Sequence, residues 1–263
     1  MRILITGAAR AIGRATAEEL IARGHDVVAT ARDPQLLADL EGGRVHALDV
    51  TDDASVAACL AAAGELDAVV NNAAIIGSGP LEDYPIDQFR KVVETNVFGA
   101  LRMIQGVVPG WRERGTQGVI VNVSSVQGRV ATPLEGPYAA SKHALEGLSE
   151  TLHYELAHFG IRVVIVEPGF IAPGMKHNSD EHAGPAVYQQ LWDEWSDTDT
   201  TLNEGGRPGP DLAARAIADA IEQPDTPLRV PVGADAEMIF ATRKALGDAE
   251  FEATMRTTIG LEW

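Results

Sequence analysis

Short apolar runs rich in Val, Ile and Ala recur along the chain, and longer stretches with helical spacing separate them. Runs of this length and composition are typical of strands buried on both faces of a parallel sheet. We predict seven such strands, at residues 2–6, 25–31, 45–50, 66–71, 116–123, 161–166 and 228–232. The last run contains Pro231, which places it at an edge of the sheet or at the end of a strand.

The stretches between these runs predict helices: one through Arg23, one over Ala54–Ala63, one over Ile86–Arg114 broken near Pro109, and one over Tyr138–Phe159 ending at Gly160. Strands alternating with helices specify a parallel sheet that helices cover on both faces. The pattern therefore predicts an α/β fold, a Rossmann-type doubly wound parallel sheet of about seven strands. We expect residues 1–263 to form a single domain.

Polar and small residues stand at the ends of the predicted strands. Ligands of such sheets bind at the carboxyl ends of the strands. The residues found at or just after strand ends are Gly7, Asp49, Asn71, Ser125 and Pro168. Because parallel strands all end at one edge of the sheet, these residues predict a single site there.

Composition narrows the class of partner. The formal net charge of −17 argues against nucleic acid and against an anionic membrane surface. No apolar run approaches the 18 residues of a membrane span, and the chain enters a strand at once without an export signal, so we expect a cytoplasmic protein. Histidines and carboxylates show no metal-ligand spacing, so we expect no catalytic metal.

The first strand runs into a glycine turn, GAARAIG, and then into a helix. Gly7 and Gly13 allow a tight bend there, and the N–H groups of a helix N-terminus stabilise an approaching phosphate. Arg10 in this turn and Arg32 after the second strand favour a 2′-phosphate, and so NADP(H) over NAD(H). The alternative is that both arginines are solvated loop residues.

Tyr138 and Lys142 are four residues apart, on one face of a predicted helix. An ammonium beside a phenol favours the phenolate, so we expect Lys142 to lower the pKa of Tyr138 and make it an acid or base. Ser125 follows the fifth strand, where its hydroxyl could bond the same substrate oxygen. Asn96 interrupts the apolar face of a helix, where an amide tends to have a specific role. The Tyr–Lys spacing by itself is more often a solvated helix face.

Seven segments in order resemble the motifs of the short-chain dehydrogenase/reductase family, over residues 1 to about 235. They are TGAARAIG, Asp49, NNAA, NVFG, NVSS, YAASK and EPG. The resemblance implies catalysis by Tyr138, with Ser125 stabilising the substrate oxygen, Lys142 holding the nicotinamide ribose, and Asn96 completing a water-linked proton relay. It implies cofactor contacts from Gly7, Arg10, Ile12, Gly13, Arg32, Asp49, Val50, Asn72, Ala73, Tyr138, Lys142, Pro168, Gly169 and Ile171.

Three positions depart from the family pattern. Ala11 replaces the middle glycine of the turn, Ala74 replaces the last glycine of NNAG, and Pro173 stands where the family often has a threonine. That threonine bonds the nicotinamide carboxamide, so the contact must come from backbone, at Ile171. None of the changes removes a catalytic group.

The segment from about 170 to 210 is where the family places a substrate flap. Tyr188, Leu191, Trp192 and Trp195 share one helical face there, which either closes over an apolar substrate or packs on the protein body. Residues 236–263 predict an amphipathic helical tail that could dock on another subunit, and we expect a homodimer or homotetramer.

Two functions are compatible with this sequence. The first is an NADP(H)-dependent oxidoreductase that interconverts a carbonyl and an alcohol on an apolar or aromatic small molecule. The second is a non-catalytic regulatory protein that senses NADP(H). A damaged catalytic set would mark the regulator, and here all four residues are present.

Overall fold

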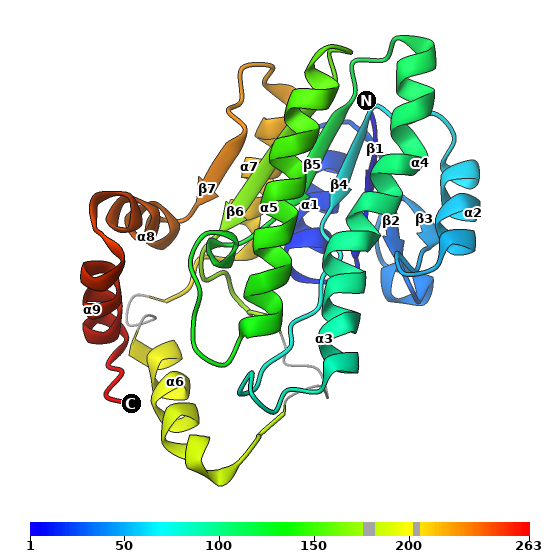
Figure 1. Cartoon of the computed structure of the whole chain (residues 1–263). Coiled ribbons are helices and arrows are strands. Elements are labelled where there is room, and N and C mark those ends of the chain that lie inside the picture. The colour runs from blue at the N-terminus through cyan, green and yellow to red at the C-terminus, as the bar shows by residue number, and fades with distance from the viewer. Residues whose placement is uncertain (176–181, 202–205) are drawn as a thin grey trace.

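One sheet with helices on both of its faces forms the body of the molecule (Figure 1). The computed structural model describes residues 1–175, 182–201 and 206–263, with the backbone alone for 197–201. Its strands are β1 (Arg2–Ile5), β2 (Asp26–Ala31), β3 (Arg44–Ala47), β4 (Ala68–Asn71), β5 (Val119–Val123), β6 (Arg162–Pro168) and β7 (Arg229–Val232). The predicted α/β, doubly wound architecture is confirmed.

All seven strands are parallel and lie in the order β3-β2-β1-β4-β5-β6-β7. The direction of winding reverses between β1 and β4, and ligands of such sheets bind at this switch point, beyond the carboxyl ends of the strands. β7 is an edge strand, as Pro231 predicts, because a proline cannot donate to a further neighbour.

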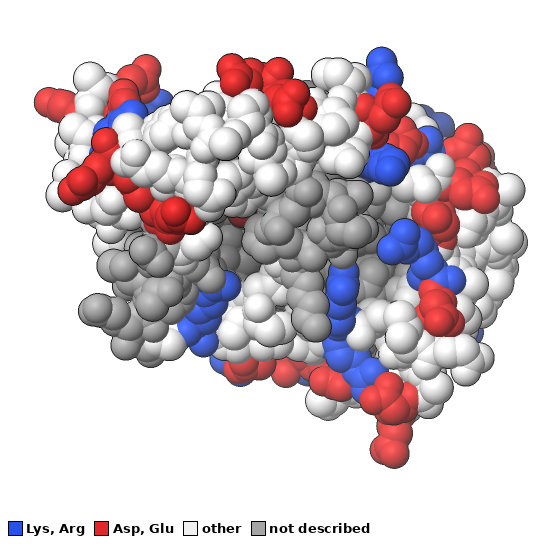
Figure 2. Space-filling model, turned by 90° about the horizontal axis from the view of Figure 1, so that it is seen from below, with Lys and Arg blue, Asp and Glu red and all other residues white. Residues whose placement is uncertain are grey.

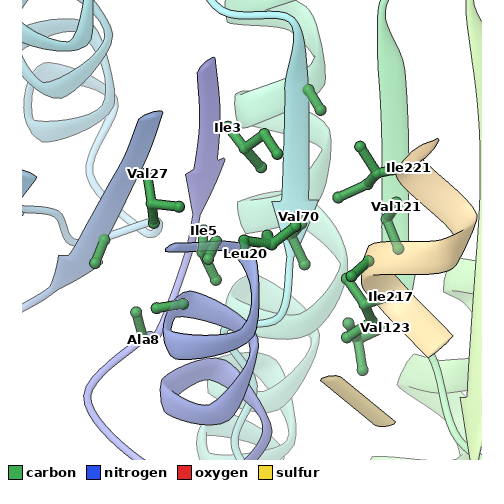
Figure 3. Packing of buried hydrophobic residues seen from close by; sticks show 14 of the residues in the cluster. Ile3, Ile5, Ala8, Leu20, Val27, Val70, Val121, Val123, Ile217 and Ile221 are labelled. Atoms are coloured by element: carbon green, nitrogen blue, oxygen red, sulfur yellow. The ribbon is translucent and has the colours of Figure 1, made fainter. Parts of the chain in front are cut away.

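Helices α1 (Ala11–Ala22) and α7 (Pro210–Glu222) cover one face of the sheet. Their apolar side chains meet those of β1, β2, β4 and β5 in one buried cluster (Figure 3). Leu20 on α1 and Ile217 on α7 are completely buried in it. This layer fixes α1 against the strand that precedes it, and so fixes the glycine turn between them.

The other face is covered by α2 (Asp53–Ala63), α4 (Gly99–Arg114) and α5 (Gly136–Ala157). Trp111 of α4 is the largest fully buried side chain, and its indole Nε1 donates 2.6 Å to the carbonyl of Leu66. The remaining helices are α3 (Ile86–Val93), α6 (Gln189–Thr201), α8 (Ala234–Ala245) and α9 (Asp248–Ile259). Among helices in the described parts of the chain, none is long and apolar enough to cross a membrane.

The helix predicted over Ile86–Arg114 is interrupted, but not at Pro109. A π-helical turn, η2 (Glu94–Phe98), separates α3 from α4, and α4 continues through Pro109. Proline frees the carbonyl of residue i−4, here Gln105. Both residues are exposed, so water can satisfy this carbonyl. The prediction was wrong about the place of the break, and the observed break contains Asn96.

The third strand is also shorter than predicted, ending at Ala47 instead of Val50. Leu48 still donates its N–H to Ala31, but Asp49 then turns the chain by accepting from the N–H and hydroxyl of Thr51 at 2.9 and 2.7 Å. An aspartate that bonds the backbone two residues on forms a turn, which competes with strand pairing. Asp49 therefore lies in the loop after β3.

Candidate active site

The loops after β1 and β4 fit against each other at the switch point. Gly7 has a left-handed φ of 67°, and a Cβ there would lie 2.9 Å from Ala73 Cα. A Cβ on Gly13 would lie 2.4 Å from the carbonyl oxygen of Gly7. Asn72 Nδ2 donates to the carbonyls of Thr6 and Gly7 at 2.9 and 3.1 Å. Both glycines are thus required by close packing, as the sequence predicted.

Helix α1 begins without a side-chain cap. Its N-cap residue, Arg10, is extended and makes no side-chain hydrogen bond to the first turn. Ala11 adopts a left-handed φ of 45°, which an L-residue with a side chain rarely adopts. Uncapped N–H groups with the helix dipole behind them are the donors that a diphosphate needs. The residues present therefore fit a dinucleotide, and Ile12 and Gly13 provide the first helical N–H groups.

The residues expected to meet the adenosine half lie after β2 and β3. Arg32 follows the last residue of β2, and neither Arg32 nor Arg10 forms an ion pair with any residue that the structure describes. Burial raises the pKa of Asp49, but the bonds from Thr51 and the charge of Arg32 together bring it below its ordinary value. Asp49 is thus a carboxylate near neutral pH, with Arg32 close enough to act on it. Val50 packs against Gly99 at the start of α4.

Ser125, Tyr138 and Lys142 come together beyond the carboxyl end of β5. Ser125 lies two residues after that strand, and α5 carries Tyr138 and Lys142 one turn apart. Tyr138 is 7% exposed and Lys142 is 3% exposed. Lys142 Nζ donates 2.7 Å to the carbonyl of Val123 and lies 5.5 Å from the centroid of the Tyr138 ring.

The protein's own groups do not lower the pKa of Tyr138. Burial raises it, a hydrogen bond with the Ser125 hydroxyl opposes the rise, and the charge of Glu135 adds to it. Burial also lowers the pKa of Lys142 to about 8, against the effect of Glu146. The expectation that Lys142 brings the phenol toward its anion was wrong for the chain itself, because removing the phenol from water outweighs the effect of the Ser125 hydroxyl. Tyr138 is a protonated phenol at neutral pH.

The side chain of Asn96 holds the loop after β4. Its Oδ1 accepts from Ile75 N–H at 2.9 Å, and its Nδ2 donates to Ile75 O and to Ser141 Oγ, each at 2.9 Å. Ser141 lies beside Lys142 on α5. The one amide of Asn96 therefore ties the loop after β4 to α5. Both N–H donors of the Asn96 amide are therefore used within the chain.

The PG turn ends β6. Pro168 is the last residue of the strand, and Gly169 donates its N–H to Val232 O at 2.9 Å. A Cβ on Gly169 would lie 2.1 Å from Asp235 Oδ2, an oxygen that also accepts from Phe170 N–H at 2.6 Å. Ile171 is buried, and its carbonyl accepts from Gly174 N–H at 2.8 Å. No motif or pattern in the sequence pointed to Asp235, which is 65 residues from its partner.

The predicted flap is described only in part, because residues 176–181 and 202–205 lie outside the described residues. His182 donates its N–H to Ser78 O at 2.8 Å, and its Nε2 lies 2.8 Å from Asp83 Oδ2. Tyr188 stacks on Trp263 with ring centroids 5.7 Å apart. The flap therefore contacts the loop after β4 on one side and the tail on the other. Figure 1 shows α6 and α9 side by side below the sheet.

The tail is helical, as predicted, but its last residues contact α6 of the same chain. Glu194 Oε2 accepts from the N–H groups of Glu262 and Trp263 at 3.0 and 3.1 Å.

Two residues of the predicted aromatic face of α6 have contacts within the chain. Leu191 is buried, and Trp192 donates its indole N–H to Ala183 O at 3.0 Å. Figure 2 shows basic and acidic side chains together on the face below the sheet.

Buried polar residues support the site, and of these the sequence indicated only Asn71. Asn71 Nδ2 donates to Asn122 Oδ1, and Asn122 Nδ2 donates to Ser149 Oγ, each at 2.8 Å. This chain joins β4, β5 and α5. Gln127 and Glu135 are hydrogen-bonded partners near Tyr138. In the sequence, the one sign of a role for Gln127 and Glu135 is that they lie between the NVSS and YAASK motifs.

Comparison with known proteins identifies the class. The model of the short chain dehydrogenase family matches residues 1–184, so the chain belongs to that family. An uncharacterised oxidoreductase of Bacillus subtilis, YusZ, is 39% identical over 179 residues, 63% of either chain. Retinol dehydrogenase 8 of Homo sapiens is 41% identical over 64% of this chain and 58% of its own. The 3-ketodihydrosphingosine reductase of Bacteroides thetaiotaomicron is 31% identical over 92% of this chain and 91% of its own.

Solved structures agree over nearly the whole chain. A short-chain dehydrogenase from Streptomyces avermitilis superposes with a TM-score of 0.79 at 34% identity, over 98% of both chains. One from Burkholderia cenocepacia, solved in complex with NADP, gives a TM-score of 0.76 at 25% identity, over 98% of this chain and 96% of that one. This protein is a short-chain dehydrogenase/reductase, an oxidoreductase of a family that uses nicotinamide cofactors.

Proposed function

We propose that this protein is an NADP(H)-dependent oxidoreductase that interconverts a carbonyl and an alcohol on an apolar or aromatic small molecule. The observation that carries the proposal is the meeting of Ser125, Tyr138 and Lys142 at the carboxyl edge of the sheet, where Lys142 Nζ lies 5.5 Å from the centroid of the Tyr138 ring. A regulator without turnover would not need this buried donor set.

The state of Tyr138 favours the acid role. Reduction of a carbonyl adds a hydride to carbon and a proton to oxygen, and the bound nicotinamide supplies the hydride. Burial keeps Tyr138 protonated, so the phenol can donate the proton to the substrate oxygen. The Ser125 hydroxyl stabilises the charge that develops on the same oxygen. In the reverse direction the deprotonated form of Tyr138 is the base that accepts the alcohol proton, and the ammonium of Lys142 stabilises this phenolate electrostatically.

Arg10 and Arg32 support NADP(H) as the cofactor. Both are exposed at loops of the cofactor half and have no ion pair within the described residues, so their guanidinium groups can bind a 2′-phosphate. An apolar substrate is supported by two relatives whose names specify retinol and 3-ketodihydrosphingosine, both of which carry hydrocarbon chains. Aromatic residues also lie before and within α6, in the segment where the family places its substrate flap.

The test is a panel of apolar ketones, aldehydes and alcohols assayed with NADPH and NADP. Tyr138→Phe should lower kcat by about 10²- to 10⁴-fold while NADPH affinity stays within twofold. Full activity in Tyr138→Phe would exclude the mechanism. Tight NADPH binding without turnover of any compound would favour the regulatory alternative.

The cofactor preference is tested separately. Arg32→Asp removes a cation and adds an acceptor for a ribose hydroxyl, so the ratio of kcat/KM for NADPH over NADH should fall by about 10- to 100-fold. Arg44→Asp is the matched control, because this arginine lies in the neighbouring strand and pairs with Asp26. An unchanged ratio in Arg32→Asp would show that the cofactor is not selected there.

A further inference from the structure

Two carboxylates are buried behind Lys142. Glu167, in β6, is 0% exposed, and Glu146, one helical turn after Lys142 on α5, is 4% exposed. Two arginines approach them. Arg229 Nε donates 3.0 Å to Glu146 Oε2, and Arg129 Nη1 lies 3.5 Å from Glu167 Oε1. The cluster therefore joins β6, α5 and β7 next to the catalytic helix turn.

Several oxygens of this cluster have no hydrogen bond from any residue that the structure describes. They are Ser124 Oγ, Glu146 Oε1, Glu167 Oε1 and Glu167 Oε2. A Cβ on Gly128 would lie 2.5 Å from Ser124 Oγ and 2.9 Å from Glu146 Oε1, so these two oxygens border the same space. Buried polar atoms are nearly always satisfied, and a proton on one carboxyl would provide a donor here.

The charges around the pair favour a single bound proton. Two buried carboxylates that act on each other do not both ionise readily. Burial raises the pKa of Glu167 to about 7, and the charge of Glu146 adds to the rise against Arg129 and Arg229. Glu146 bonds Arg229 directly, so it is the member that remains ionised. Its charge opposes the fall in the pKa of Lys142.

We propose that buried Glu167 binds one proton while Glu146, paired with Arg229, stays ionised, and that Glu146 is a positioning residue that keeps Lys142 charged and so sets the alkaline limit of the site. This proposal rests on the proposed function. The proton bound by Glu167 satisfies the pair without removing the charge of Glu146. The charged or titratable groups placed against the two carboxyls or their arginine partners are Lys142 and Glu150 on α5, Arg129 after β5 and Arg229 on β7.

The first experiment follows NADPH affinity and kcat/KM from pH 6 to 10. Glu146→Gln removes the charge that supports the Lys142 ammonium, so the alkaline loss of both quantities should move to lower pH by about one unit. Glu146→Asp should restore the limit. Glu150→Gln is the control, because Glu150 shares Arg229 but is exposed, and it should leave the limit unchanged. A Glu146→Gln profile that coincides with wild type would overturn the proposal.

The second experiment does not depend on turnover. Glu167 has a raised pKa, so its contribution to stability is complete below its ordinary value and is lost as the pH rises through about 7. The urea midpoint of the wild type should therefore fall between pH 5 and 8. Glu167→Gln keeps a neutral hydrogen-bond donor, so its urea midpoint should fall less than that of the wild type between pH 5 and 8. The alkaline limit of NADPH binding should stay unchanged.

The two readouts separate the proposals. Parallel urea profiles for wild type and Glu167→Gln would overturn the proton assigned to Glu167, whether or not any substrate is found. If no compound of the panel is turned over, the proposed function fails, but the NADPH-affinity and urea profiles still decide whether the pair exists and acts on Lys142.

Discussion

The cofactor half of the site and the flap with its tail are held by different kinds of contact. In the cofactor half, buried side chains bind main-chain groups: Thr6 Oγ1 accepts from Asn72 and Ala73, and Asn96 binds Ile75. In the flap and tail, exposed or half-buried groups meet each other, as in the stack of Tyr188 on Trp263.

This difference has an energetic consequence. A buried hydrogen bond to a main-chain group cannot be replaced by water, so its loss carries the full cost of an unsatisfied group. An exposed contact is exchanged for water at little cost. The cofactor half is therefore preorganised, whereas the flap can change partners. The family model matches residues 1–184, which include the loops after β1 and β4, whereas α6 lies beyond the match.

The largest expected loss follows from Asn96→Ala. The substitution removes three hydrogen bonds between the loop after β4, the π-helical turn and α5. It leaves Ile75 N–H without its acceptor, so the free energy of unfolding should fall by about 3 kcal/mol. Urea unfolding measures this, with exposed Phe98→Ala in the same turn as the control. Equal effects of the two substitutions would contradict a stabilising role for the hydrogen bonds of the Asn96 amide.

Thr6→Val tests the same half with a smaller change. Valine keeps the shape of the side chain, but the N–H of Ala73 loses its acceptor and the N–H of Asn72 keeps only the carbonyl of Val70. We expect the free energy of unfolding to fall by about 2 kcal/mol, and NADPH affinity to weaken because this loop lies beside Gly7. Thr258→Val, on an exposed turn of α9, should change neither quantity. A loss of stability with full NADPH affinity would show that the hydrogen bonds of Thr6 stabilise the fold but do not affect cofactor binding.

The sheet and the catalytic group were predictable because their determinants are local. Apolar runs such as Ile161–Val166 specify buried strands, and the four-residue spacing of Tyr138 and Lys142 lies within one helix. The approximate position of each strand followed from these runs.

The support of the site depends on residues distant in sequence. The bond of Phe170 to Asp235 and the meeting of Glu146 with Arg229 depend on which strands and helices become neighbours. The pKa of Tyr138 was wrongly predicted for the same reason: spacing shows that a lysine is near, but not how much water both groups lose. The π-helical turn at Asn96 likewise reflects tertiary bonds to Ile75 and Ser141.

Ala11→Gly should stabilise the cofactor half. Ala11 holds a φ of 45°, which glycine adopts without steric cost, so relief of strain should raise the free energy of unfolding by about 1 kcal/mol. Ala61→Gly on the exposed face of α2 is the matched control and should lower it by about 1 kcal/mol. Thermal or urea unfolding gives the sign directly. Destabilisation by both substitutions would mean that the turn is not strained.

Trp263→Ala should have the smallest effect on global stability and a clear local one. The stack on Tyr188 is exposed, so the free energy of unfolding should change by less than about 0.5 kcal/mol. Hydrogen exchange should quicken in α6, which loses a partner, and stay unchanged in α5. Tyr154→Ala, at an exposed aromatic of α5, is the control and should leave α6 as it is. A fall of more than about 1 kcal/mol on loss of Trp263 would mean that the tail belongs to the cooperative core, and the contrast between the two halves would not hold.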